Sequence, residues 1–242
     1  MIFVLKGANI ISKQTNLGSW NQDKLILDSV KFFLVETKKQ RNFFNNIVKT
    51  HHSYVNTTTY GGRQINWLIH SNIGYVGAIG LGSAIMALKD RDNFIGWNKE
   101  TRLRNLVNIA NNWRCCLMGN YKNLGTKVLS LLIKHGKIEW QKKYGDELYL
   151  IETLIKPPKT GLMYLAGCWS QVGHTKGSQF KWIHKKNWDQ YNKEGWTVMQ
   201  KYQQYGKIKD LDRWNIIKEG GTEKKIILVK PINKHWAKKL QK

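Results

Sequence analysis

The chain is 242 residues long and carries 40 Lys and Arg against 16 Asp and Glu, which gives a formal net charge of +24. Such a charge favours nucleic acid as the partner over a membrane surface, because phosphates release counterions to distributed cations; a compositional excess of lysine is the alternative. The few carboxylates disfavour a metal-dependent nuclease or transposase, and no apolar run reaches the ~20 residues that span a membrane.

The cysteines and the first five residues indicate the cellular compartment in which the protein is expected. Cys115, Cys116 and Cys168 are an odd number without CxxC spacing, which argues against a disulfide scaffold or a zinc site and is typical of a reducing environment. The apolar start at residues 1–5 is too short for a signal sequence, because Lys6 follows it. We therefore expect a cytoplasmic protein with one globular core and no metal.

Residues 1–50 form a predicted N-terminal extension that packs on or beside the core. Short apolar runs alternate there with Lys-, Arg- and Asn-rich sequence. The apolar face of one helix is expected to hold four phenylalanines, which are Phe32, Phe33, Phe43 and Phe44. We find no functional motif in this extension.

The predicted core, residues 51–180, opens with a β-hairpin. A strand over residues 64–69 and a return strand over 75–80 flank a turn that contains Asn and Gly. His51 and His52 precede the first strand. Because adjacent residues on a strand point to opposite faces, we interpret the pair as surface histidines rather than as converging metal ligands.

A charged triplet, Asp90-Arg91-Asp92, follows the hairpin. It forms a buried ion-pair brace or a solvated loop, or it presents a carboxylate such as Asp92 to a substrate amine. The first two interpretations are favoured because charged loops are mostly structural. A helix that begins near Asn98 and a strand over residues 113–118 come next.

The stretch over residues 123–177 is the part around which the chain is organised. A polar turn opens its helix and consists of Asn123, Leu124, Gly125, Thr126 and Lys127. Free backbone N–H groups at such a helix start can hold an anion, usually a phosphate. The helix leads to a strand over residues 148–155, which should lie parallel to the strand over residues 113–118 in a right-handed βαβ unit.

Glu152 lies in the otherwise apolar strand over residues 148–155. Burial of an unpaired carboxylate costs free energy. Glu152 therefore either faces water at a sheet edge or takes part in catalysis. A Pro-Pro break at residues 157–158 and a short helix over residues 163–170 follow, and that helix carries Tyr164.

Residues 181–242 form a basic, aromatic-rich segment. Its aromatic residues alternate with lysines and are Trp182, Trp188, Tyr191, Trp196, Tyr202, Tyr205 and Trp214. Aromatic faces stack on bases while neighbouring cations meet phosphates, as in the binding of single strands or flipped bases. The alternative is a surface appendage whose aromatics pack on the core. A last strand is predicted over residues 224–232.

Several collinear stretches within residues 60–180 carry a resemblance to a known family. They are Lys89–Trp97, Arg102–Leu106, Asn111–Arg114, Asn123–Leu129, Ile151–Thr153, Tyr164–Trp169 and Gly173–Gly177. In these stretches the chain resembles the Druantia A protein family. That resemblance implies a role in anti-phage defence or in mobile elements.

The order of elements also resembles GNAT N-acyltransferases, in particular the phage Mom enzyme that modifies adenine in DNA. Tyr164 and Trp169 fall where such enzymes carry Tyr-x-x-x-Gly-Phe, with Cys168 in place of the glycine. The resemblance implies an α/β fold, with a mixed sheet around a central βαβ unit. It also implies an acyl donor, either a coenzyme A thioester or an aminoacyl-tRNA, with its phosphate on the turn over residues 123–127.

Two hypotheses of different class follow. In the first, the protein is an acyltransferase that modifies a base amine in nucleic acid, DNA being favoured, with Glu152 or Asp92 as the base and Tyr164 as the acid for the leaving group. In the second, it is a catalytically silent nucleic-acid-binding subunit of a defence or transposition system. The residues expected to contact nucleic acid are Arg91, Trp97, Arg102, Trp169, His174, Lys176, Trp182 and Trp188.

Overall fold

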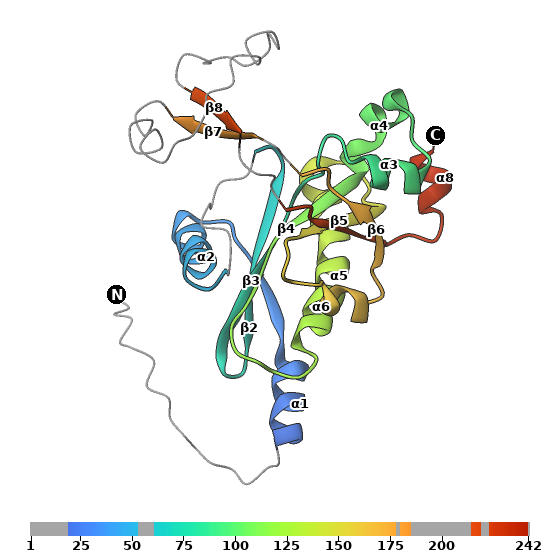
Figure 1. The fold of residues 1–242 in the computed structure, drawn as a ribbon. Helices are drawn as coiled ribbons and strands as arrows, with labels where there is room; N and C mark the ends of the chain where they lie inside the picture. Colours follow the sequence, from blue (N-terminus) through green and yellow to red (C-terminus); the bar gives the residue numbers. More distant parts are fainter. Residues whose placement is uncertain (1–18, 53–60, 178–179, 185–213, 219–222, 242) are drawn as a thin grey trace.

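The computed structural model describes residues 19–52, 61–177, 180–184, 214–218 and 223–241 (Figure 1). Its centre is a seven-stranded sheet with the order β1-β2-β3-β4-β5-β9-β6. These strands are β1 (Lys31–Leu34), β2 (Gln64–Ser71), β3 (Gly74–Ser83), β4 (Ile109–Leu117), β5 (Leu150–Ile155), β6 (Ser170–His174) and β9 (Ile226–Pro231). A two-stranded sheet pairs β7 (Phe180–His184) with β8 (Trp214–Lys218).

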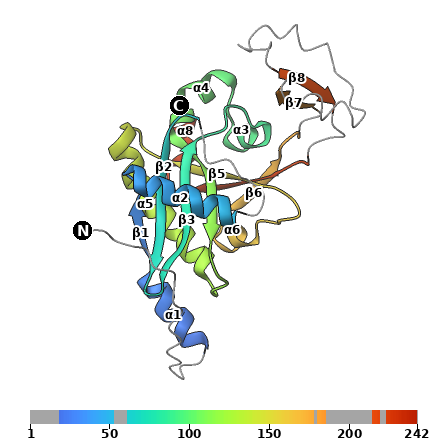
Figure 2. The same cartoon turned by 90° about the vertical axis from the view of Figure 1, so that its left-hand side faces the viewer.

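Helices cover both faces of the central sheet (Figures 1 and 2). They are α1 (Ser19–Ser29), α2 (Lys38–His51), α3 (Lys89–Ile95), α4 (Lys99–Asn105), the 3-10 turn η1 (Leu106–Asn108), α5 (Leu124–Tyr144), α6 (Leu162–Ala166) and α8 (Trp236–Leu240). Successive residues of β2 point to opposite faces. Trp67 packs in the cluster that holds Leu132 of α5, whereas Leu68 packs with Phe44 of α2. The sheet is therefore the middle of three layers.

The predicted α/β fold with a central βαβ unit is confirmed. Strands β4 and β5 are parallel and α5 connects them, whereas every other neighbouring pair in the seven-stranded sheet is antiparallel. A mixed sheet with this one parallel pair at its centre is the arrangement that we expected from the order of elements. The last strand, β9, lies inside the sheet between β5 and β6.

The prediction that four phenylalanines share one helix is wrong. Phe32 and Phe33 lie on β1, which pairs with β2 at the edge of the sheet. Thr37 then begins α2 with a capping box, in which its hydroxyl accepts a hydrogen bond from the Gln40 N–H and Gln40 Oε1 accepts one from the Thr37 N–H. This strong start signal separates the two earlier phenylalanines from the two that lie on α2.

The parallel strands β4 and β5 stay paired over a short register. It runs from Ile109 opposite Leu150 to Asn111 opposite Glu152. Beyond that point β4 continues to Leu117 and the two strands are no longer paired with each other. An opening therefore forms in the middle of the sheet. Among the described helices, none is long and apolar enough to cross a membrane.

Candidate active site

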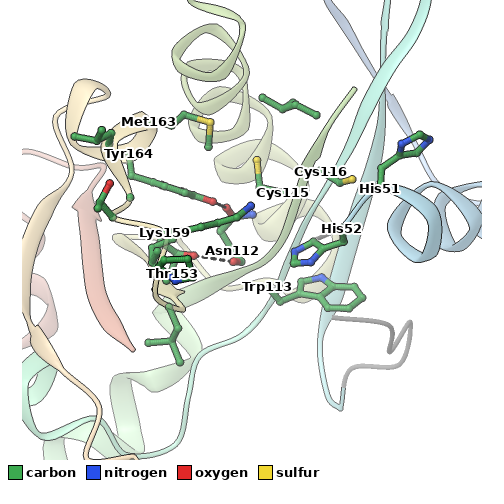
Figure 3. Close-up of a pocket in the computed structure, with 17 residues that line it drawn as sticks. His51, His52, Asn112, Trp113, Cys115, Cys116, Thr153, Lys159, Met163 and Tyr164 are labelled. Carbon is green, nitrogen blue, oxygen red and sulfur yellow. Dashed lines mark hydrogen bonds between the residues drawn. The ribbon is translucent and has the colours of Figure 1, made fainter. Parts of the chain in front are cut away.

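A cavity of about 470 Å³ lies where β4 and β5 part (Figure 3). Its walls come from the end of α2, from β4, from β5 and from the loop and helix that follow β5. The lining residues with polar or reactive side chains include His52, Asn112, Cys115, Thr153, Lys159 and Tyr164. In the ranges that the structure describes, no cluster of His, Cys, Asp and Glu could hold a metal ion.

A β-bulge lies on β4 beside the cavity. Gly80 lies opposite Arg114 while the next residue of β3, Leu81, lies opposite Asn112, so Trp113 is an extra residue in the ladder. A bulge disturbs the ladder and re-aims side chains, which is why bulges occur often next to active sites. Here Asn112 and Trp113 both line the cavity.

Tyr164 and Asn112 form a short hydrogen bond within the cavity. The Tyr164 hydroxyl donates to Asn112 Oδ1 at 2.6 Å. Asn112 Nδ2 donates to the carbonyl oxygens of Gly80 and Arg114, both at 2.9 Å, so the orientation of the amide is set by its surroundings. Trp169 packs edge-on against the Tyr164 ring with the centroids 4.9 Å apart. Both the hydroxyl and the ring of Tyr164 are thus held in place.

Glu152 and Thr153 are adjacent on β5 and point to opposite faces of the sheet. Thr153 lines the cavity and its Oγ1 donates to the Asn112 carbonyl oxygen at 3.1 Å. On the other face, Glu152 Oε2 lies 2.7 Å from Arg91 Nη1, and Oε1 accepts the Ile85 N–H at 2.7 Å. Burial raises the pKa of the fully buried Glu152, and the Arg91 charge opposes that shift. Glu152, predicted as a base that acts together with Tyr164, therefore does not share the cavity with Tyr164.

Asp92 is held in the same ion-pair network. Its Oδ1 lies 2.7 Å from Arg91 Nη2, and its Oδ2 lies 2.9 Å from Arg102 Nη1. Arg91 is fully buried and Asp92 is 7% exposed. Of the three interpretations of the charged triplet, the buried brace is the observed one. Asp92 ties α3 to α4 and does not line the cavity.

Burial, and after it nearby positive charge, shifts the pKa values of groups in the cavity. The pKa of His52 is lowered to about 4, first by burial and then by the charges of Arg114 and Lys159, so its imidazole is neutral at pH 7. Burial raises the pKa of the Cys115 thiol to about 12, which disfavours a reactive thiolate. In Figure 3 the Lys159 side chain runs across the cavity toward Tyr164.

Acidification from pH 6.5 to pH 4 should destabilise the fold through His52. Its folded-state pKa of about 4 lies below the usual 6.5, so the unfolded chain takes up the proton first. The contribution of neutral His52 to the free energy of unfolding is therefore complete above pH 6.5 and is lost as the pH falls toward 4. His52→Gln should remove this share of the pH dependence, whereas the matched control His51→Gln should keep it. Urea midpoints at pH 7 and 4.5 measure the difference, and equal pH dependence in wild type and His52→Gln would contradict the prediction.

The turn predicted to hold phosphate opens α5 next to the cavity without lining it. Asn123 has a left-handed backbone conformation (φ 62°) and its side chain caps no helix N–H. The Thr126 hydroxyl donates back to the Asn123 carbonyl oxygen at 3.0 Å. Gly125 abuts Met163, a lining residue, so closely that an added Cβ would lie 2.4 Å from Met163 Cγ. Gly125 thus allows α6 to approach the start of α5.

Three of the residues predicted to contact nucleic acid are buried. Arg91, Trp97 and Trp169 are 0%, 8% and 3% exposed. The Arg91 guanidinium lies 5.7 Å from the centre of the Trp97 ring, and Trp97 Nε1 donates to the Leu240 carbonyl oxygen. Trp169 packs on Tyr164. These side chains are not accessible to bases or phosphates, so for them the prediction is wrong.

The remaining predicted contacts fall into two groups. His174 at the end of β6 and Lys176 in the chain that follows are exposed, and Arg102 is partly exposed on α4. Their contact with nucleic acid stays a prediction. The side chain of Trp182 on β7, and the whole of Trp188, lie outside the described residues. The same is true of the side chains of the other aromatics in the predicted stacking segment.

Several polar cavity residues escaped the sequence-based prediction, among them His52, Asn112, Thr153 and Lys159. Asn112 and Thr153 had a signal, because each belongs to a polar pair in a buried strand and one member of such a pair must face a polar environment or a partner. His52 and Lys159 had none, since the fold alone brings the end of α2 against the loop that follows β5.

The family model for the Druantia protein DruA matches residues 21–209 of the chain. A search of curated proteins finds the Druantia protein DruA of Escherichia coli (strain UMEA 4076-1), which is 30% identical over 95 residues. That alignment covers 37% of this chain and 24% of the relative's length. The chain is therefore matched to about a quarter of the curated relative.

Solved acyltransferase structures resemble the chain at low sequence identity. Spermidine N-acetyltransferase from Vibrio cholerae, in complex with CoA and spermine, is 7% identical with a TM-score of 0.44, and the alignment covers 84% of this chain and 96% of that one. FeeM, an N-acyl amino acid synthase from uncultured soil microbes, is 10% identical with a TM-score of 0.44, over 86% and 92% of the two chains. Similarities of this size say nothing about substrates.

Proposed function

This chain belongs to the Druantia protein DruA family, and from that premise we propose that it is an acyltransferase that modifies a base amine of nucleic acid, DNA being favoured, in anti-phage defence. The observation that carries the proposal is the cavity between β4 and β5, in which the Tyr164 hydroxyl is held by Asn112. The opening of a GNAT-like sheet at its parallel pair offers a donor and an amine a common site. The specific likeness to the phage Mom enzyme stays a hypothesis.

Tyr164 is proposed as the acid for the leaving group. When the amine attacks the acyl carbonyl, the departing group acquires negative charge and needs a proton. The Tyr164 hydroxyl donates to the neutral amide of Asn112 in the described structure. A charged leaving group is a stronger acceptor than an amide oxygen, so the hydroxyl would turn from Asn112 to it. Asn112 is then the positioning residue that holds the proton donor ready.

His52 replaces Glu152 and Asp92 as the proposed proton acceptor. Both carboxylates are held in ion pairs outside the cavity, whereas His52 lines it. Its lowered pKa keeps the imidazole neutral at pH 7. A neutral imidazole can accept the proton that the amine loses after attack, and the amine in the tetrahedral adduct is acidic enough for a weak base to suffice.

The acyl donor is proposed to be a coenzyme A thioester or an aminoacyl-tRNA, which would supply the activated acyl group. The N–H groups of Leu124 and Lys127 donate within the chain, to the carbonyl oxygens of Tyr121 and Asn123 at 3.2 and 3.1 Å. The N–H groups of the residues at 125 and 126 are therefore the ones proposed to hold a donor phosphate, since the side chain of Asn123 does not cap the helix.

Nucleic-acid binding should be tight at low salt and should weaken steeply as salt rises. A net charge of +24 permits many phosphate contacts, and six to ten of them would weaken binding by about a thousandfold or more between 50 and 200 mM salt. Fluorescence anisotropy with labelled single-stranded and duplex DNA, titrated at several salt concentrations, measures the slope. An affinity that does not change with salt would contradict the nucleic-acid part of the proposal.

Mass spectrometry tests the chemistry. The full chain is incubated with DNA or RNA and with either acetyl-CoA or charged tRNA, and the nucleosides are then analysed for an added acyl mass. We expect a modified base with one donor and one nucleic acid. Nucleosides that stay unmodified with every combination, from a chain that binds nucleic acid, would remove the transferase proposal.

A catalytically silent nucleic-acid-binding subunit is the second candidate. One observation favours it: Glu152 and Asp92 both form ion pairs with Arg91. These are the carboxylates that were expected to accept a proton. Among the described lining residues this leaves His52 as the proposed acceptor. Binding without modification, as in the outcome above, would establish this candidate in place of the first.

A further inference from the structure

We propose that a row of aromatic rings, on the face of the sheet that α2 crosses, binds a single strand of nucleic acid by stacking on its bases. The rings of this row belong to Phe33, Phe43, His70 and Tyr75. The inference rests on the proposed function, because it names the strand form and the surface that would deliver a base amine to the cavity. Bases in a duplex are paired and stacked on one another, so only an unpaired strand offers its base faces to such a row.

The row runs across three strands and one helix. Phe33 of β1 lies edge-on to His70 of β2 with the ring centroids 5.7 Å apart, and His70 lies edge-on to Tyr75 of β3 at 5.0 Å. The ring of Tyr75 meets that of Phe43 on α2 at 4.9 Å. The strand register places Tyr75 directly opposite His70. The four side chains therefore form one continuous aromatic surface, although they come from four different elements.

The row is open to solvent. Phe33 is 46% and Tyr75 is 44% exposed, whereas Phe44, the neighbour of Phe43 on α2, is fully buried against the sheet. The hairpin end of β2 and β3 extends beyond α2 on this face (Figure 2). A T-shaped contact covers at most one face of one of its two rings, so the contacts within the row leave ring faces for a base. Because stacking uses ring faces, the hydroxyl group of Tyr75 is not part of this surface. Contiguous exposed apolar side chains of this kind mark an interaction site.

The elements that carry the row are basic. Strands β1, β2 and β3 and helix α2 contain no Asp or Glu. Their lysines and arginine are all exposed and are Lys31, Lys38, Lys39, Arg41 and Lys49. Lys31 lies opposite His70 in the strand register, so the two share a face of the sheet. The nearest carboxylates along the chain from β1, Asp28 on α1 and Glu36 in the loop before α2, lie outside these elements. Rings flanked by cations are complementary to unpaired bases on a chain of phosphates.

Helix α2 leads from the row to the cavity. The helical rise places Phe43 about 13 Å from His52, which lines the cavity. Lys49 in the last turn of α2 adds a cation between them along the helix. A strand that stacks on the row therefore needs only a few nucleotides to bring another of its bases to Tyr164. The row and the cavity together suit a substrate that is unpaired over this length.

Fluorescence anisotropy with the full chain tests the inference. The probes are labelled single strands of DNA and RNA of one sequence and the matching DNA duplex. Phe33→Leu removes the ring but keeps an apolar side chain on β1. It should weaken single-strand binding about fivefold to a hundredfold, the range for one lost stacking contact. Duplex binding, which relies on charge, should stay near the wild-type value, and Phe33→Trp, which supplies a ring, should bind the strands as wild type does. A loss confined to DNA or to RNA identifies the strand that uses the row.

The matched control is Phe32→Leu. Phe32 is the neighbouring ring on β1, but it faces the other side of the sheet, where its centroid lies 5.9 Å from that of Trp67. This variant should lower stability without changing the affinity of the folded protein for a single strand.

Two results would overturn the inference. One is a single-strand affinity of Phe33→Leu that equals the wild-type value or falls no more than its duplex affinity. The other is a dimer in light scattering that Phe33→Leu abolishes while strand affinity is kept, which would assign the row to a second copy of the chain. Because the readout is binding, a protein that fails to modify bases can still confirm the inference. Conversely, a Phe33→Leu protein that binds strands and modifies bases as wild type does would remove the inference and leave the proposed function in place.

Discussion

Arg91→Met should lower the free energy of unfolding by about 3–5 kcal/mol, the usual loss when one partner of a buried ion pair is removed. Arg91 and Glu152 are both fully buried and lie 2.7 Å apart. Methionine fills a similar volume but leaves the Glu152 carboxylate without its counter-charge. The same substitution removes both hydrogen bonds from Arg91 to Asp92. The result should be a large loss of stability with the fold otherwise unchanged.

Urea unfolding followed by tryptophan fluorescence measures this effect. The matched control is Lys156→Met, which breaks a pair with Glu223 whose side chains are 44% and 56% exposed. An exposed pair contributes about 0–1 kcal/mol, so the control should be nearly neutral. If Arg91→Met were as mild as Lys156→Met, the network would not be a brace, and the assignment of Glu152 to structure rather than to chemistry would lose its basis.

Tyr164→Phe should reduce the transfer rate by about 100-fold, the scale for loss of a positioned acid or base. The substitution removes the hydroxyl that Asn112 holds and keeps the ring that Trp169 packs against. The amide oxygen of Asn112 loses a partner, so a stability loss of about 1 kcal/mol accompanies the change. Nucleic-acid affinity should stay near the wild-type value, because Tyr164 is only 6% exposed.

The control for this experiment is Tyr75→Phe. Tyr75 is 44% exposed on β3 and does not line the cavity, so its hydroxyl should be dispensable. Rates from nucleoside mass spectrometry are compared at equal amounts of folded protein. Activity of Tyr164→Phe that follows the folded fraction would make Tyr164 a structural residue. Loss of activity in both variants would indicate a general effect of tyrosine removal rather than a proton donor.

Local sequence patterns predicted the βαβ unit, because residues close together in the sequence determine each of its strands and its helix. The apolar runs of β4 and β5 and the amphipathic α5 between them each reflect burial of one face, and the crossover rule then makes the strands parallel. Tyr164 was predicted as a site residue through the resemblance to GNAT N-acyltransferases, because it falls where such enzymes carry Tyr-x-x-x-Gly-Phe. Its position on the cavity follows from that helix packing on the start of α5 at Gly125.

The partner of Glu152 could not be predicted in the same way. The alternation of side chains along a strand predicts that Glu152 and Thr153 face opposite sides of the sheet. It does not predict on which side the cavity lies. That choice depends on Arg91, which lies on α3 and is brought to β5 by the tertiary fold. His52 and Lys159 present the same difficulty, because His52 caps the end of α2 and Lys159 lies in the loop after β5. Each is placed by the packing of its neighbours rather than by a pattern of its own.

The position of β9 inside the sheet has a consequence for synthesis on the ribosome. Strand β5 ends at Ile155 and β6 at His174, but both pair with β9, which begins at Ile226. As the nascent chain emerges, one edge of β5 keeps unpaired backbone N–H and C=O groups until β9 has been synthesised. Unpaired edges invite association with other chains, and closing so long a loop slows folding. Chaperone contact during this interval should therefore matter more than for a sheet assembled in sequence order.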